Sequence, residues 1–342
     1  MIVLFEFFVS PFYILAIYIC IGKVMKEVIT LGEVIVEVMA KKTNQLFIES
    51  GEFLGPYPSG APAIFINQVA KMKVPASIIG CVGQDDFGKV CLNRLIENGV
   101  NTSLIDVDNE LPTGTAFVRY QSNGSRNFIF NIRHSAAAAF YLTDVAKERL
   151  STCAVLHVMG SSIFSHAVIN MVREAIEIVR NNGGRISFDP NVREELLSDS
   201  TLFEFFKEVL ANTDIFLPSG EELYALTNKQ TLEDAVESAL ELGVSEIVLK
   251  QGADGCAFYS HNDYFFMPSF SVEEIDATGA GDTFGATYIA CRELGYSPKK
   301  SLGLANASGA TAVSHWGPME GASSEEELNK FIDTFIESLE EI

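Results

Sequence analysis

Basic residues are scarce in this chain of 342 residues. It has 24 Lys and Arg against 45 Asp and Glu, which leaves a formal net charge of −21 at pH 7. A surface this acidic repels nucleic acid and anionic membranes, so neither is expected as a partner. Any nucleotide must therefore be held by local positive features rather than by the overall field of the protein.

Cysteine is also sparse, and its positions show no pattern. The six cysteines are scattered, with no C-x-x-C pair and no Cys/His spacing typical of a metal site. This distribution argues against a zinc site and a disulfide framework, and it indicates buried thiols in a reducing, cytoplasmic compartment. The chain also lacks repeats and low-complexity tracts, and its length suits one large domain with a small appendage.

Residues 1–22 are nearly all apolar, but they lack what a signal peptide or a membrane span requires. No positive charge precedes the apolar run, as a secretory signal would need. The uninterrupted part, residues 12–21, has about 10 residues where a membrane span needs about 20. A typical protein beginning follows at Met25. We therefore expect residues 1–24 to be an apolar leader outside a folded domain of residues 25–342.

The remaining chain alternates β-prone and helix-prone segments. Strands are expected near 155–159, 186–189, 215–217 and 246–250, each followed by a helix or a hairpin. This order predicts an α/β fold, a mostly parallel central sheet with helices on both faces. Segments near 34–58 and 113–133 do not fit the alternation and are expected to form a small β-sheet lid.

Three local predictions accompany this fold. Residues 41–60 are polar and rich in Gly and Pro, which predicts a loop. Residues 272–275 have the composition of a β-strand. Ser323 and Glu326 have the spacing of a capping box, which predicts that the last helix begins there.

The most informative stretch is residues 276–286, which read D-A-T-G-A-G-D-T-F-G-A and lead into helical spacing. Gly279, Ala280 and Gly281 carry almost no side chain, so their N–H groups at a helix start can bind an anion such as phosphate. Asp282 lies at the same helix start. A carboxylate there would repel phosphate, but it suits a reaction that takes a proton from a hydroxyl attacking phosphorus.

Two other interpretations of this stretch stay open. It is compatible with a plain glycine-rich turn whose Asp caps the helix. Gly279, Gly281 and Gly285 also come within one residue of the dinucleotide-binding spacing, which requires a following strand with an acidic residue. Here a second helix is predicted instead, after Y-S-P at 296–298, so a dinucleotide enzyme is disfavoured.

Several separated segments together resemble the ribokinase-like sugar kinases of the PfkB family, from about Val28 to the C-terminus. The segment D-x-x-G-A-G-D-x-F at 276–284 resembles the C-terminal signature of that family. Four more matches follow the family order: V-G-x-D-x-F-G at 82–88, P-T-G-T-A at 112–116, D-P-N-x-R at 189–193 and L-K-x-G-x-x-G at 249–255. The D-P-N-x-R segment is typical of the fructokinase and 2-keto-3-deoxygluconate kinase branch.

The resemblance implies a kinase that uses ATP and Mg²⁺ to phosphorylate a primary hydroxyl of a small sugar. The sugar would be a ketohexose of the fructose or tagatose type, or a 2-keto-3-deoxy sugar acid. Asp282 would be the catalytic base, and the amides of Gly279, Ala280 and Gly281 would stabilise the transferred phosphoryl group. Some members also use a monovalent cation such as K⁺, and Asp276 resembles a position near that loop.

The resemblance also carries over binding residues. On the nucleotide side these are Asn191, Lys250, Gly252, Gly255 and Asn306. On the sugar side these are Glu37, Gly60, Arg133, Arg193 and Asp282. Glu222 would help to organise Mg²⁺, although Ser219 replaces the Asn of the family motif. Arg133 would meet a substrate carboxylate or a phosphate, or else lie on the lid surface.

Two further expectations concern the whole protein. Ile64 stands where the family has a sugar-binding Asn, which disfavours ribose or a nucleoside as the substrate. A homodimer through the lid sheet is expected, because lid sheets with an exposed face often pair between subunits. The alternative to a kinase is a non-catalytic regulator on the same fold that binds a sugar or a nucleotide.

Overall fold

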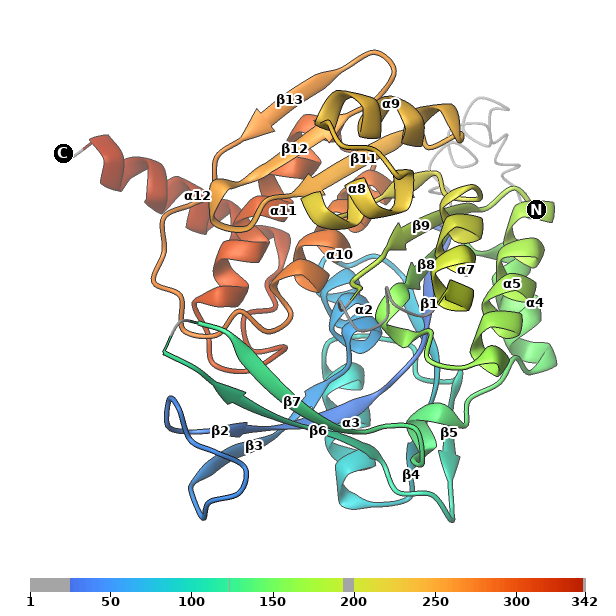
Figure 1. The fold of residues 1–342 in the computed structure, drawn as a ribbon, viewed down its shortest axis with the longest axis vertical. Coiled ribbons are helices and arrows are strands. Elements are labelled where there is room, and N and C mark those ends of the chain that lie inside the picture. The colour runs from blue at the N-terminus through green and yellow to red at the C-terminus, as the bar shows by residue number, and fades with distance from the viewer. Residues whose placement is uncertain (1–24, 123, 193–199, 341–342) are drawn as a thin grey trace, which may run out of the picture.

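A nine-stranded sheet forms the centre of the protein in the computed structural model, which describes residues 25–122, 124–192 and 200–340 (Figure 1). Its strand order is β13-β12-β11-β10-β9-β8-β1-β4-β5. The strands from β11 to β5 are parallel, and β12 and β13 continue the sheet as an antiparallel hairpin edge. The predicted α/β fold with a mostly parallel sheet is confirmed.

The strands of this main sheet are β1 (Val28–Leu31), β4 (Ala76–Gly83), β5 (Ile105–Asp108), β8 (Val155–Met159), β9 (Arg185–Asp189), β10 (Ile215–Phe216), β11 (Glu246–Lys250), β12 (Cys256–Tyr259) and β13 (Tyr264–Met267). The α-helices are α2 (Ala61–Lys71), α3 (Asp86–Glu97), α4 (Asp144–Thr152), α5 (His166–Asn181), α7 (Ser200–Leu210), α8 (Gly220–Thr227), α9 (Leu232–Glu241), α10 (Ala280–Glu293), α11 (Pro298–Val313) and α12 (Glu325–Glu340).

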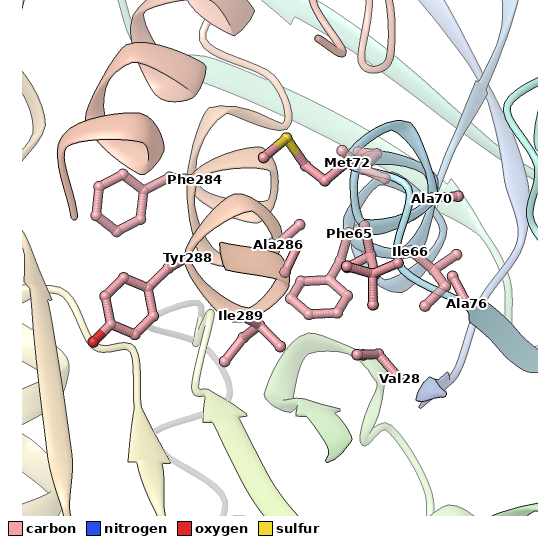
Figure 2. Close-up of a cluster of buried hydrophobic side chains, with 14 of the residues drawn as sticks. Val28, Phe65, Ile66, Ala70, Met72, Ala76, Phe284, Ala286, Tyr288 and Ile289 are labelled. Atoms are coloured by element: carbon pink, nitrogen blue, oxygen red, sulfur yellow. The ribbon is translucent and has the colours of Figure 1, made fainter. Parts of the chain in front are cut away.

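The helices cover both faces of the main sheet, so the chain has two large hydrophobic cores. The helices α2, α3, α10, α11 and α12 pack on one face, and α4, α5, α7, α8 and α9 pack on the other. Successive side chains of a strand point to opposite faces, so Val28 enters the first core and Ile29 the second. Figure 2 shows Phe65 of α2 facing Ala286 and Ile289 of α10 above Val28. This packing fixes the position of α10.

A smaller sheet, called the second sheet below, has the order β3-β2-β6-β7 and lies beneath the main sheet in Figure 1. Its strands are β2 (Ile35–Ala40), β3 (Phe53–Ser59), β6 (Gly114–Tyr120) and β7 (Arg126–Asn131). These strands fall in the two segments that the sequence left outside the βα alternation. Because β2 follows β1 after three residues, the second sheet begins where a central strand of the main sheet ends.

Two local predictions were wrong: a predicted loop contains a strand, and a predicted strand is absent. The expected loop at 41–60 contains β3, because an edge strand tolerates proline: Pro56 and Pro58 lie within it. Residues 272–275 form no strand. Ile275 is 44% exposed, and its N–H donates to the carbonyl of Val313 at the end of α11 instead of to a neighbouring strand.

The predicted capping box was wrong by one residue. Ser324 and Glu327 form the reciprocal bonds, with Ser324 N donating to Glu327 Oε2 at 2.7 Å. Ser323 is buried instead, and both of its backbone groups bond to the side chain of Gln68: its N–H at 2.9 Å and its carbonyl at 2.8 Å. Gln68 also donates to Thr287 of α10 at 2.9 Å. One buried amide therefore joins α2, α10 and the start of α12.

Replacing Gln68 by leucine is expected to lower the free energy of unfolding by about 2–4 kcal/mol, because two buried backbone groups lose their partners. Unfolding by urea measures the change. Lys71→Met on the same helix is the matched control, since its ammonium lies half-exposed and 4.0 Å from Glu327, and it should change the free energy by less than about 0.5 kcal/mol. Equal stability of the two variants would contradict this role of Gln68.

The expected leader, residues 1–24, lies outside the described residues. Among the helices that the structure describes, none combines the length and the hydrophobicity needed to cross a bilayer.

Candidate active site

The glycine-rich stretch opens α10, as the sequence predicts. Gly279 is the N-cap with φ of 78°, and a Cβ there would lie 2.6 Å from the carbonyl oxygen of Pro318. Only glycine fits this position for both reasons. The first ladder bond of the helix runs from Thr283 N to Gly279 O at 2.8 Å. The N–H groups of Ala280 and Gly281 precede that bond, so they have no acceptor inside the helix. The N–H of Ala280 makes a long bond of 3.5 Å to the carbonyl oxygen of Ala277, just before the helix.

Asp282 lies in the first turn of α10 and is 8% exposed. Its Oδ1 accepts a hydrogen bond from Asn191 Nδ2 at 3.2 Å. Burial, and then the carboxylate of Asp189, raise the pKa of Asp282 to about 8, although Lys250 acts to lower it. The carboxyl group is therefore held near the pKa that a proton acceptor needs at neutral to weakly basic pH.

Lys250 and Asp189 form a buried ion pair beside Asp282. Asp189 ends β9 and Lys250 ends β11, so both lie at the carboxyl edge of the parallel strands, where α/β proteins bind ligands. Lys250 Nζ donates to Asp189 Oδ2. The same ammonium lies 3.8 Å from the point where a Cβ on Gly281 would be. Its positive charge is thus next to the first amides of α10.

The pKa values of this pair follow from burial and from each other. Burial raises the pKa of Asp189 to about 6, although Lys250 acts to lower it. Burial lowers the pKa of Lys250, but the carboxylates of Asp189, Glu222 and Asp282 outweigh this effect and leave it raised. Lys250 is therefore a cation at physiological pH.

Asn191 and Glu222 hold the turn that follows β9. Asn191 has φ of 40°, in the left-handed region, and its N–H donates to Asp189 Oδ1 at 3.1 Å. Glu222 Oε1 accepts from Val192 N at 2.8 Å, and its Oε2 accepts from Ser219 N at 2.7 Å. The carboxylate of Glu222 thus ties this turn to the start of α8.

The predicted magnesium role of Glu222 stays a prediction. In the described ranges, no group of three His, Cys, Asp or Glu side chains is arranged to hold a metal ion. A site with only one or two carboxylates still fits Mg²⁺, because this ion keeps several waters and also binds substrate phosphates. Glu222 and Asp189 are the carboxylates near Lys250 that are suited to that role.

The predicted sugar-side residues lie where the second sheet meets α2. Glu37 of β2 is 3% exposed, and its Oε2 accepts from Ser59 Oγ at 3.0 Å. Gly60 is the N-cap of α2 with φ of 106°, and a Cβ there would lie 2.4 Å from the carbonyl oxygen of Glu33. The carboxylate of Glu33 is buried, accepts a bond from Ser162 and contributes to raising the pKa of Asp282. Glu33 and Glu37 are therefore two buried carboxylates on the sugar side of the site.

The second sheet contacts the start of α10 at two points. Tyr120 OH at the end of β6 donates to Asp276 Oδ1 at 3.2 Å, and Arg126 Nη1 of β7 donates to Thr278 Oγ1 at 2.9 Å. Asp276 is buried and also accepts from Thr278 N at 3.0 Å and from Gly317 N at 3.1 Å. One carboxylate therefore joins the second sheet, the α10 turn and the α11–α12 loop.

The remaining predicted nucleotide-side residues lie near β12 and α11. Gly252 has φ of 57°, and no atom lies within 4 Å of the point where its Cβ would be. The fold itself requires glycine at position 255, because a Cβ there would lie 2.1 Å from the carbonyl oxygen of Met267. Asn306 of α11 donates from Nδ2 to the carbonyl of Pro268 at 2.7 Å, so it holds the loop after β13.

The two arginines predicted on the sugar side have different outcomes. Arg133 is exposed and lies two residues beyond β7. Arg193 lies outside the described residues. The arginine of β7 that contacts the α10 start is Arg126, to which the sequence analysis gave no role. The sequence could have indicated Arg126 through its position in the strand. Arg126, Phe128 and Phe130 alternate along β7, so their side chains lie on one face of the strand.

Glu33 and Asp189 were also given no role from the sequence. Each follows or ends a parallel strand of the main sheet, β1 and β9, at the edge that carries Lys250. Noting that both acidic residues come at the carboxyl ends of predicted strands would have found them.

This fold, with bare amides and a carboxylate at one helix tip and a buried cation beside them, is that of a ribokinase-like phosphotransferase. The model of the pfkB family of carbohydrate kinases matches residues 25–325. The chain belongs to this family and is a carbohydrate kinase.

Solved structures and curated relatives agree with this assignment. A protein of Escherichia coli provisionally named ribokinase II is 46% identical, with a TM-score of 0.88 over 90% of this chain and 99% of that one. A fructokinase of Vibrio cholerae O395, solved as a double mutant with fructose, ADP and potassium ion, is 25% identical, with a TM-score of 0.77 over 90% of this chain and 98% of that one. The curated fructokinase of Vibrio alginolyticus is 28% identical over 90% of this chain and 99% of its own length.

Proposed function

We propose that this protein transfers the γ-phosphoryl group of ATP to a primary hydroxyl of a ketohexose of the fructose or tagatose type, or of a 2-keto-3-deoxy sugar acid. The observation that carries the proposal is the helix tip of α10, where Asp282 lies beside amides that have no acceptor inside the helix and beside the ammonium of Lys250. The E. coli protein has also been solved in complex with ATP and Mg²⁺.

Asp282 takes the proton of the sugar hydroxyl as its oxygen attacks phosphorus. The raised pKa of this carboxyl group favours such a transfer, because a base is most effective when its pKa is near the working pH. The amide of Asn191 is bonded to Oδ1 and helps to hold the carboxylate. Oδ2 is then the oxygen that would accept the proton of the hydroxyl. Asp282 is therefore both the base and the residue that positions the sugar.

The charge of the phosphoryl group is stabilised from two sides. The amides of Gly279, Ala280 and Gly281 lie at the N-terminus of α10, and Lys250 lies beside Gly281. Fixed donors of this kind stabilise charge as it develops, without reorganisation. Mg²⁺, when bound with ATP, would neutralise phosphate charge, with Glu222 and Asp189 as the nearby carboxylates. Gly252, Gly255 and Asn306 line or shape the nucleotide side.

A ketohexose is favoured by the sugar-side residues. Glu33 and Glu37 are buried carboxylates that accept bonds from hydroxyl groups of the protein, and they suit the hydroxyls of an uncharged sugar in the same way. Several relatives are fructokinases, among them that of Vibrio alginolyticus. If the substrate is an acidic sugar, Arg133 and Arg193 are the candidates for binding its carboxylate.

Three properties complete the proposal. A homodimer forms through the second sheet, whose Ile129 is 46% exposed on β7. A monovalent cation such as K⁺ acts near Asp276, since the Vibrio cholerae fructokinase was solved with potassium ion. The protein acts in the cytoplasm, because all five cysteines in the described residues are free and buried. A non-catalytic regulator is not favoured, since it would not need to keep Asp282.

The substrate class is tested by measuring ATP consumption with the purified protein over ketoses, aldoses and 2-keto-3-deoxy sugar acids. Fructose or tagatose should give kcat/KM at least about 10-fold above ribose, since Ile64 removes a polar contact that ribose would need. Asp282→Asn is the control for contaminating kinases. Phosphorylation of ribose at the highest kcat/KM would overturn the substrate class without touching the kinase assignment.

A further inference from the structure

Arg126 differs from most arginines of this protein because it forms no ion pair with any residue that the structure describes. It is the first residue of β7, is half-buried and pairs with Tyr120 of β6. Its guanidinium bonds to the neutral hydroxyl of Thr278, and no carboxylate in the described part of the chain lies within 4.0 Å of it. By contrast, six arginines bond to a carboxylate: Arg94, Arg149, Arg173, Arg180, Arg185 and Arg292.

The position of this charge is fixed by two contacts. Nη1 is 2.9 Å from Thr278 Oγ1, and Cζ lies 5.8 Å from the centroid of the Phe128 ring. Phe128 stacks in turn on Phe130, with centroids 5.1 Å apart. The guanidinium is therefore held on the inner face of β7 and directed at the loop before α10.

Thr278 is the residue before Gly279, so Arg126 contacts the chain one step, or about 3.8 Å between Cα atoms, before the amides of the α10 tip. Its charge reaches the site, because Arg126 is one of the two cations that act to lower the pKa of Asp282. The other is Lys250, beside Gly281. One cation comes from the main sheet and one from the second sheet.

We propose that Arg126 is a catalytic residue whose guanidinium binds the phosphoryl group in transfer, which rests on the proposed kinase function. In this step the sugar oxygen forms a bond to phosphorus and the bond from phosphorus to the bridging oxygen of ADP breaks. ADP leaves with that electron pair, and the hydroxyl proton goes to Asp282. Arg126 exchanges no proton and stabilises charge on the equatorial oxygens.

The contacts of Arg126 fit binding to the phosphoryl group better than binding to a sugar carboxylate. Arg126 bonds to the turn that begins α10, where the amides of the helix tip lie, while Glu37 and Glu33 are on the sugar side. Because Arg126 belongs to the second sheet, its charge is in place only when that sheet contacts the α10 turn. Transfer to water is then suppressed, since the catalytic set is incomplete without this contact.

The test compares Arg126→Gln, Arg126→Lys and Arg126→Ala with Arg119→Gln. Arg119 is the matched control, because it also lies on the second sheet but its guanidinium lies over Phe47, with Cζ 5.9 Å from the ring centroid. We expect Arg126→Gln to lower kcat about 10- to 100-fold while the KM values for sugar and ATP change less than about 3-fold. Arg126→Lys should recover part of kcat, free guanidinium should partly rescue Arg126→Ala, and Arg119→Gln should stay near the wild type.

The assays use fructose and a 2-keto-3-deoxy sugar acid in parallel. Loss confined to the KM of the acid would overturn the proposal, since Arg126 would then bind a substrate carboxylate. Unchanged kcat with both substrates, in variants of unchanged Tm, would also overturn it. A wild-type protein that phosphorylates no sugar would contradict the proposed function itself, whereas an active wild type with a fully active Arg126→Gln would contradict only this assignment.

Discussion

Asp282→Asn is expected to lower kcat by about 10²- to 10⁴-fold and to leave sugar and ATP binding nearly intact. The amide has the shape of the carboxyl group and keeps the contact with Asn191, but it cannot accept the hydroxyl proton. Steady-state kinetics and titration calorimetry with sugar and with ATP measure the two quantities. Asp86→Asn is the matched control, since Asp86 also lies in the first turn of a helix but is exposed and pairs with Lys89.

Thermal stability gives an independent check on the same residue. The pKa of Asp282 is about 8 in the fold against an ordinary 3.8, so the folded protein binds more protons between these values. Stability from the protonated group is full at low pH and is lost as the pH rises through about 8. Asp282→Asn should therefore have a higher Tm than the wild type at pH 9 and nearly the same Tm near pH 4. Normal turnover of this variant would remove Asp282 from the mechanism.

Lys250→Met is expected to lower kcat about 10²- to 10³-fold, because the site loses the cation beside Gly281. It should also move the pH profile. In the wild type kcat/KM rises with pH towards a plateau above about 8, as Asp282 ionises. Lys250 acts to lower that pKa, so its removal shifts the rise to higher pH.

Loss of the lysine also leaves Asp189 buried without its cation, which destabilises the fold. The double variant Lys250→Met/Asp189→Asn removes that charge and should recover most of the Tm but little of kcat. Lys147→Met is the control, because its ammonium pairs with Glu174 on the surface. A single variant with unchanged kcat and an unchanged pH profile would show that Lys250 only balances the charge of Asp189.

The sequence predicted those features that depend on neighbours along the chain. The bare amides and Asp282 lie within four consecutive residues, so their helix-tip geometry follows from local rules. The parallel order of the main sheet likewise follows from βα alternation. By contrast, β3 was missed because proline argues against a strand unless that strand is known to be an edge.

Contacts between distant segments could not be predicted in the same way. The partner of Lys250 is 61 residues away, and Arg126 reaches a threonine 152 residues away. Which arginine of the β6–β7 hairpin enters the site depends on strand register, since a shift by one residue reverses the face. Arg133 was predicted on the sugar side of the site, but the register of β7 gives the contact to Arg126.

The carboxylate of Asp276 connects three parts of the chain. It accepts hydrogen bonds from Tyr120, Thr278 and Gly317. We expect the second sheet to break its bond to this carboxylate each time a phosphorylated sugar is released. The strength of the tyrosine bond thus sets a compromise between shielding the reaction from solvent and the speed at which product escapes.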